Sequence, residues 1–197
     1  MRIKRKFFDR NTLVVAKELL GKYLCRRING KIIKARITET EAYCGTRDLA
    51  CHASKGLTPR TKVMFGPPGH AYVYMIYGMY HCLNFVTEEE GSPSAVLIRG
   101  AEICSKYYVL SIKGKNGNKK PIIHNTNPII QRLNGPGILC RELKIDQKLN
   151  NTDLVKSKEL WIEDGGDLIK QSQIKKGKRI GVDYAGKWKD KLWRFYL

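Results

Sequence analysis

Lys31-Ile-Ile-Lys-Ala-Arg-Ile-Thr-Glu-Thr-Glu-Ala-Tyr43 is the segment from which the architecture of this chain can be inferred. Its odd positions are apolar from Ile33 to Ile37 and then become glutamates, Glu39 and Glu41, whereas its even positions include lysine, arginine and two threonines. Because successive side chains of a β-strand point to opposite faces, this alternation predicts a strand whose odd positions face inward. Both carboxylates should therefore lie on the inward face, near one end of the strand.

The two glutamates mark a candidate site. Burial raises the pKa of a carboxyl group and costs several kcal/mol unless hydrogen bonds or cations compensate. A pair of carboxylates at the end of an apolar face is therefore a candidate for chemistry. Structural ion pairs with basic neighbours perturb carboxylates in the same way, so this pattern alone leaves a structural role equally open.

Two turn signals place this strand and a later pair of strands in hairpins. Asn29-Gly30 follows a shorter strand at Tyr23–Ile28, and both turn positions tolerate the positive φ of a two-residue turn. Gly78 separates a second pair, Ala71–Tyr77 and Met79–Thr87, which leaves Tyr77 at the tip. The candidate carboxylates thus lie on the second strand of the first hairpin.

The other expected elements are short. A helix capped by Asn11 or Thr12 should end at Gly21, and the lysine-rich segment Lys113–Lys120 should be a surface loop. These elements together predict a mixed α/β domain that is mostly antiparallel. The remaining predictions are a helix over Gly137–Leu143 and strands at Ala95–Arg99, Leu160–Ile162 and Arg179–Tyr184.

Charge is the extreme feature of the composition. The 197 residues include 37 Lys and Arg against 18 Asp and Glu, a net charge of +19. Such an excess predicts a polyanionic partner, most simply nucleic acid, although a general lysine bias of the source would give the same excess. A normal 42% of apolar residues favours a folded domain over a disordered basic tail.

Cysteine usage and the apolar pattern predict an intracellular, soluble, cytoplasmic protein. The six cysteines form no Cys-x-x-Cys pair and no cluster with histidine, so we expect reduced thiols and no metal site. The first residues lack the apolar region of a secretion signal. No run of about 18 apolar residues is present for a membrane span.

Aromatic residues are dense between positions 72 and 86, and most of them should be core because aromatics favour sheets and bury much area. Tyr77 differs because a residue beside a turn glycine has little core to fill. It is a candidate wedge that separates stacked bases, or else a tip residue folded back onto the sheet. His52 is similarly either a site residue or a satisfied core histidine.

A basic surface, a desolvated carboxylate, several aromatics and a projecting tyrosine together suit an enzyme that extrudes a base from duplex nucleic acid. The chain also carries the segments Glu39-Thr-Glu-Ala-Tyr43 with Asp48 and His52, Met64–Gly69, Tyr72–Tyr80 with Asn84, Val96–Arg99, Gly135–Cys140, Asp153-Leu154, Arg179–Val182, Ala185–Trp188 and Arg194–Tyr196. In these segments, which together extend over nearly the whole chain, it resembles the alkyladenine, or 3-methyladenine, DNA glycosylase family.

The resemblance implies an α+β fold in which residues 1–197 form a single compact mixed α/β domain, with a mostly antiparallel curved sheet flanked by helices and a protruding β-hairpin. It implies a monofunctional enzyme that flips alkylated or deaminated purines out of double-stranded DNA and hydrolyses the N-glycosidic bond, which starts base excision repair. No metal or cofactor is implied. We expect a monomer, nucleoid-associated in a bacterial cytoplasm, with no membrane partner.

The resemblance also assigns roles. Glu41 matches the catalytic carboxylate that activates water, and Arg99 matches a residue beside that water, whereas Glu39 is only supporting. Glycosidic cleavage passes through an oxocarbenium-like state, which a nearby carboxylate stabilises while it deprotonates the nucleophile.

The base-binding positions carry over in the same way. Tyr43, His52 and Tyr74 match the stacking walls around the extruded base, Asn84 matches a filter against an exocyclic amino group, and Tyr77 matches the intercalating wedge. Ring alkylation makes a purine cationic, and a cation against a tyrosine face gains about 0.5–2 kcal/mol.

Some features depart from this family or suggest another protein class. Cys44 stands where a bulkier aliphatic residue is expected, and Cys104–Pro128 carries no recognisable motif. Leu133–Gly137 faintly resembles a helix-hairpin-helix loop, but the downstream aspartate and helices of that glycosylase class are missing, and no lysine is singled out as a lyase nucleophile. The alternative from another class is a non-catalytic nucleic-acid-binding protein, which leaves Glu39 and Glu41 unexplained.

Overall fold

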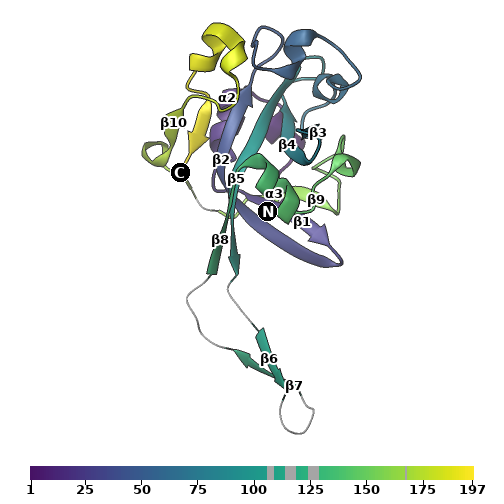
Figure 1. Ribbon diagram of the computed structural model, residues 1–197, viewed down its shortest axis with the longest axis vertical. Helices are drawn as coiled ribbons and strands as arrows, with labels where there is room; N and C mark the ends of the chain where they lie inside the picture. The colour runs from purple at the N-terminus through teal and green to yellow at the C-terminus, as the bar shows by residue number, and fades with distance from the viewer. Residues whose placement is uncertain (106–108, 114–118, 124–128, 167) are drawn as a thin grey trace.

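The computed structural model describes residues 1–105, 109–113, 119–123, 129–166 and 168–197. Within this part of the chain, nine strands form one sheet in which every pair of neighbours is antiparallel, and short helices lie against it (Figure 1). The predicted α+β class and mostly antiparallel sheet are therefore confirmed. No helix in the described ranges has the length and apolar character needed to cross a bilayer.

The central strands of the sheet run in the order β10-β11-β2-β5-β4-β3, with β1 beside β2, β9 beside β1, and β8 beside β5. Strands β6 and β7 pair separately. The strands are β1 (Tyr23–Ile28), β2 (Lys31–Tyr43), β3 (Ala71–Ile76), β4 (Tyr80–Thr87), β5 (Ser94–Ser105), β6 (Val109–Lys113), β7 (Lys119–Ile123), β8 (Ile129–Asn134), β9 (Leu160–Glu163), β10 (Lys175–Gly177) and β11 (Arg194–Tyr196). The helices are α1 (Arg5–Phe8), α2 (Thr12–Glu18), α3 (Pro136–Glu142) and the 3-10 turns η1 (His52–Lys55), η2 (Lys62–Phe65), η3 (Gln147–Leu149), η4 (Gln171–Gln173) and η5 (Asp183–Asp190).

Both predicted hairpins are present. Asn29 and Gly30 have φ of 49° and 77° and join β1 to β2, as expected for a turn that needs positive φ at both central positions. Tyr77 and Gly78, with φ of 51° and 68°, likewise join β3 to β4. The Tyr77 side chain is 86% exposed, so it projects from the tip and does not fold back onto the sheet.

The N-terminal helix follows its predicted signals. The Asn11 side chain accepts a hydrogen bond from the Leu13 N–H and caps α2, and Gly21 adopts φ of 81° shortly after the helix ends. Its buried face packs into the main hydrophobic core through Val15 and Ala16. This helix covers the face of β2 that lies away from the candidate site.

A register shift reverses the alternation of β2 partway along the strand. Its pairing with β5 is irregular between Ile37 and Thr40, as at a β-bulge. Before the irregularity the odd positions pack in the main core, and after it the even positions do. Glu41 consequently lies on the opposite face from Ile37, and the prediction of one continuous inward face is wrong beyond Ile37. The core-facing side chains of β2 are Ala35, Ile37, Thr40 and Ala42.

The strand predicted at Arg179–Tyr184 is wrong. The chain leaves β10 at Gly177 and turns through Gly181, whose φ is 76°, before η5 begins at Asp183. Burial of the Arg179 side chain and a hydrogen bond from this loop to β2 hold the segment in an irregular conformation. A strand-like composition was therefore overridden by tertiary contacts.

Other boundaries differ modestly from the predictions. Strand β5 extends well beyond Arg99, and α3 begins at Pro136, a proline at the first helical position. The ends of the predicted loop Lys113–Lys120 belong to β6 and β7, and residues 114–118 lie outside the described residues.

Candidate active site

A cavity of about 320 Å³ opens between β2, β5, the β3–β4 hairpin, η1 and the loop before η5. Its volume is within the range of ligand pockets. The structure brings six of the seven predicted site residues to its wall from positions up to 56 apart in the chain. They are Tyr43, His52, Tyr74, Tyr77, Asn84 and Arg99.

Glu41, the seventh, lies directly behind the wall and is completely buried. Its Oε2 accepts a hydrogen bond of 2.8 Å from the Tyr43 hydroxyl, and its Oε1 accepts one of 2.9 Å from the Ile180 N–H. Burial raises the pKa of the Glu41 carboxyl, while Arg99 and these two donors oppose the rise. The carboxylate is thus held rigidly between three groups that line the cavity.

Arg99 bridges the two glutamates. Its Nε is 3.5 Å from Glu41 Oε1 and 3.3 Å from Glu39 Oε1. Glu39 also forms an ion pair of 2.9 Å with Arg194 of β11. Among the described residues, Arg99 Nε has no partner that meets hydrogen-bond geometry. This buried donor lies beside the carboxylates of Glu39 and Glu41.

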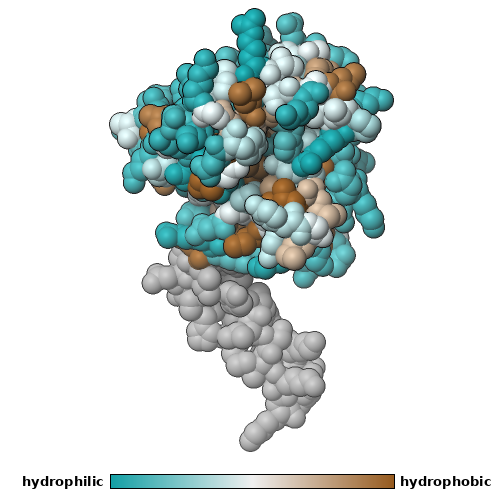
Figure 2. Space-filling model, turned by 45° about the horizontal axis from the view of Figure 1, so that its top comes forward, coloured by the Kyte–Doolittle hydropathy of each residue, from teal (hydrophilic) through white to brown (hydrophobic). Residues whose placement is uncertain are grey.

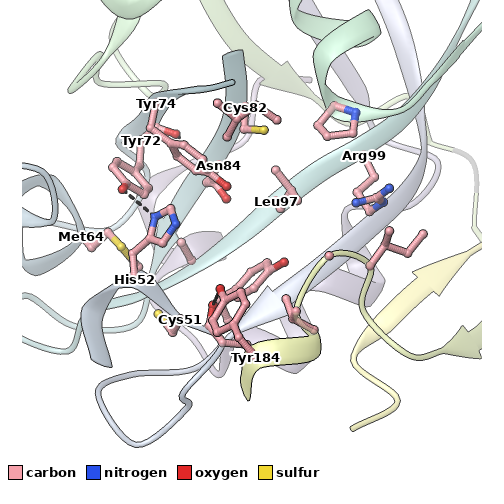
Figure 3. A pocket seen from close by; sticks show the side chains of 18 of the residues that line it. Cys51, His52, Met64, Tyr72, Tyr74, Cys82, Asn84, Leu97, Arg99 and Tyr184 are labelled. Carbon is pink, nitrogen blue, oxygen red and sulfur yellow. Dashed lines mark hydrogen bonds between the residues drawn. The ribbon is translucent and has the colours of Figure 1, made fainter. Parts of the chain in front are cut away.

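An aromatic wall forms the other side of the cavity. Figure 3 shows His52, Tyr72 and Tyr74 together, with Arg99 across from them. His52 Nδ1 is 2.9 Å from the Tyr72 hydroxyl, and the His52 ring is 4.6 Å from the Tyr74 ring at an interplanar angle of 70°. Burial, assisted by Arg60, lowers the pKa of His52 to about 4. His52 is therefore neutral at physiological pH and presents its ring to the cavity.

Asn84 and Tyr77 differ in how tightly the structure holds their side chains. Asn84 is buried in β4, and its side-chain amide donates a hydrogen bond of 3.0 Å to the Tyr72 carbonyl, which fixes its orientation. Tyr77 stands at the rim of the cavity and is otherwise exposed. The site thus combines a rigid floor with a free aromatic at its edge.

Sequence reasoning missed the ion pair that supports this site. Arg179 donates to both oxygens of Asp48 at 2.5 and 2.8 Å, and both side chains are fully buried. The same guanidinium donates to the Ala42 carbonyl and lies 4.8 Å from the Tyr43 ring centroid. Burial alone would lower the pKa of Arg179, but Asp48 raises it, so the pair stays charged. Both residues fall in family motifs, but no local signal pairs positions 131 residues apart.

Two further neighbours of the site were not predicted. Tyr184 lines the cavity from η5, opposite the hairpin, and the Arg60 guanidinium lies 4.9 Å from the Tyr74 ring centroid. No group of three His, Cys, Asp or Glu side chains in the described residues is arranged to hold a metal ion. Two free thiols, Cys51 and Cys82, also line the cavity.

The molecular surface suits a polar ligand. Figure 2 shows a largely hydrophilic face interrupted by small, separate apolar patches. With a net charge of +19, such a surface favours association with a polyanion.

Over nearly its whole length the chain is similar to known proteins of one kind. A family model described as Methylpurine-DNA glycosylase (MPG) matches residues 6–197. A protein of Methanocella arvoryzae named "Putative 3-methyladenine DNA glycosylase" is 48% identical over 194 residues, covering 98% of this chain and 91% of the relative. Proteins with the same name from Desulfitobacterium hafniense and Legionella pneumophila (strain Corby) are 46% and 47% identical, covering all of this chain and 95% and 94% of their own lengths.

Proposed function

Since this chain belongs to the methylpurine-DNA glycosylase family, we propose that it is a DNA-3-methyladenine glycosylase that flips alkylated or deaminated purines out of double-stranded DNA and hydrolyses their N-glycosidic bond. The observation that carries this proposal is the buried carboxylate of Glu41 behind an aromatic-lined cavity with an exposed tyrosine at its rim. The match over residues 6–197 supports one glycosylase domain spanning 1–197.

In this proposal, Glu41 is the general base. Glu41 takes a proton from a water that enters through the cavity, beside Arg99 and Tyr43, as the water oxygen attacks the anomeric carbon of the sugar. The glycosidic bonding pair leaves with the base. A purine alkylated at N3 or N7 carries a positive charge and departs as a neutral molecule, so its release needs no acid. The carboxylate also stabilises the oxocarbenium-like transition state.

Base selection follows from the cavity wall. Tyr43, His52 and Tyr74 offer ring faces to a planar purine, and a cationic purine gains about 0.5–2 kcal/mol from such contacts. A neutral His52 adds no repulsion to a cationic base. The fixed amide of Asn84 restricts which edge of a purine fits.

Tyr77→Ser is expected to weaken the affinity for a lesion-containing duplex by about 5- to 150-fold, because a stacked aromatic contributes about 1–3 kcal/mol per base. Fluorescence anisotropy with a catalytically blocked enzyme measures this directly. Tyr77→Phe, which keeps the ring, should bind as the unaltered chain does. Equal affinity of the serine and phenylalanine variants would contradict the wedge assignment.

The rate of base release should fall in acid as Glu41 becomes protonated, because only the carboxylate form accepts a proton. Its raised pKa places this decline above the ordinary value of 4.5. Arg99→Gln removes a charge that lowers the Glu41 pKa, so the decline should move to higher pH. Single-turnover rates on a 7-methylguanine duplex measure the profile, since that base needs no protonation to leave. If the rate declined at the same pH in Arg99→Gln as in the wild type, the assignment of Glu41 as the general base would be contradicted.

The competing function is a non-catalytic nucleic-acid-binding protein. A fully buried glutamate beside a polyanion site repels the ligand and serves no purpose in such a binder. Single-turnover assays of duplexes carrying a 3-methyladenine analogue, hypoxanthine or ethenoadenine separate the two functions. Release of any of these bases supports the glycosylase, whereas tight duplex binding without release favours the binder.

A further inference from the structure

A permanent positive charge lies against the outside of the aromatic wall. The Arg60 guanidinium carbon is 4.9 Å from the Tyr74 ring centroid. Tyr74 lines the main cavity, but Arg60 is not among the described residues that line it. Arg60 instead borders a smaller hollow of about 250 Å³, together with Lys55. The two hollows share Cys51, His52 and Tyr184, and the exposed Arg60 side chain places its charge over the Tyr74 ring from outside the main cavity.

This contact affects charged and neutral bases differently. A tyrosine ring attracts a cation through its electron-rich face, and a guanidinium already over the ring uses that attraction and repels a second cation that approaches the same ring. A neutral purine stacks mainly through buried area and dispersion, which the guanidinium leaves nearly unchanged. Arg60 should therefore penalise a cationic base more than a neutral one.

On these grounds, and resting on the proposed function, we propose that Arg60 is a specificity-determining residue that weakens the capture of positively charged purines relative to neutral ones. Its contact with the Tyr74 ring sets how strongly the cavity favours charged alkylation products. Neutral lesions such as hypoxanthine thereby remain competitive substrates.

The charge of His52 also depends on Arg60, so the protonation state of His52 must be held constant in a test. Burial is the main cause of the lowered His52 pKa, and Arg60 lowers it further. Loss of Arg60 would raise the pKa of His52, and in acid the protonated His52 would then place a positive charge in the wall. At about pH 8, burial alone keeps His52 neutral, so a change in its charge does not contribute to the result.

The experiment compares Arg60→Gln with Lys55→Gln. Lys55 lies on the same hollow and is exposed, so its removal takes away the same charge without touching Tyr74. Duplexes identical except for a 7-methylguanine or a hypoxanthine are cleaved at limiting enzyme, which gives a ratio of second-order rate constants for each variant. We expect the rate constant for the charged base, divided by that for the neutral base, to rise about 2- to 5-fold in Arg60→Gln. In Lys55→Gln this ratio should stay at the wild-type value.

A second pair of variants links the effect to the ring. In a Tyr74→Leu background the Arg60→Gln change should no longer alter the ratio, since the shared π face is gone. An unchanged ratio in Arg60→Gln itself overturns the proposal. An equal loss of rate on both lesions, together with a weaker dependence of that rate on salt concentration, also overturns it, because that result would make Arg60 a phosphate contact. Failure of the wild type to release either base would instead contradict the proposed function.

Discussion

Replacing Glu41 by glutamine should lower the single-turnover rate of base release by about a hundred- to ten-thousand-fold, while the affinity for a lesion-containing duplex stays close to that of the unaltered chain. Glutamine fills the same space and can still accept from the Ile180 N–H, so the wall of the cavity should keep its shape. It cannot take a proton from water. Rapid-quench assays of base release and anisotropy titrations measure the two quantities independently.

Glu39→Gln is the matched control. Glu39 also faces Arg99, but it is paired with Arg194 and lies two residues before Glu41 in β2. Its loss should reduce the rate far less than the loss of Glu41. Comparable rates for Glu41→Gln and the wild type would show that another group activates the water. A loss of affinity equal to the loss of rate would make Glu41 a structural residue.

Asp48→Ala should destabilise the fold by about 3–5 kcal/mol, because it leaves the Arg179 guanidinium buried without its partner. For a chain of this size, the melting temperature should fall by about 6–20 °C. Asp48 also accepts hydrogen bonds from the Cys44 and Ala50 N–H groups, so the loop between β2 and η1 loses its anchor as well. Thermal unfolding followed by circular dichroism tests the expectation.

The exposed pair Lys178–Asp190 provides the comparison for this measurement. Its atoms are 2.6 Å apart, but both side chains are more than half exposed. Water screens such a pair, so Asp190→Ala should melt close to the wild-type temperature. If Asp48→Ala also melted close to the wild-type temperature, the buried pair would contribute little to stability, and another contact would have to hold Arg179 against Tyr43.

Local chemistry accounts for the parts of the fold that were predicted well. The turns at Asn29-Gly30 and Tyr77-Gly78 depend on backbone conformations that only a few residues tolerate, and their effect reaches no further than the adjoining strands. The cap of α2 by Asn11 is similarly a contact between near neighbours. Such features can be inferred from one sequence because the interacting groups are adjacent in it.

The family motifs also point to residues that meet in the folded chain. The resemblance assigns Tyr43, His52, Tyr74 and Asn84 to base binding, and all four line one cavity. Their roles in base binding remain predictions. For Tyr77 the sequence leaves a projecting and a folded-back side chain open, and its exposure in the structure decides between them.

The face on which Glu41 lies depended on the tertiary structure. A strict two-residue alternation would have placed Glu41 on the same face of β2 as Ile37. The bulge opposite β5 places it on the other face. A bulge depends on how two strands pair, so alternation within one of them does not reveal it. The wrong strand at Arg179–Tyr184 has a similar cause, because contacts with β2 and Asp48 outweigh the local preference of that segment.

The sequence alone was thus sufficient for the fold class, the two hairpin turns and the residue types of the candidate site. The folded chain was needed for the carboxylate's partners, namely the Ile180 N–H at 2.9 Å and Arg99 at 3.5 Å, and for the Asp48–Arg179 pair behind Tyr43. Turns and caps are decided by neighbours within a few positions. Burial, ion pairing and pKa depend on groups that meet only when segments far apart in the chain pack together.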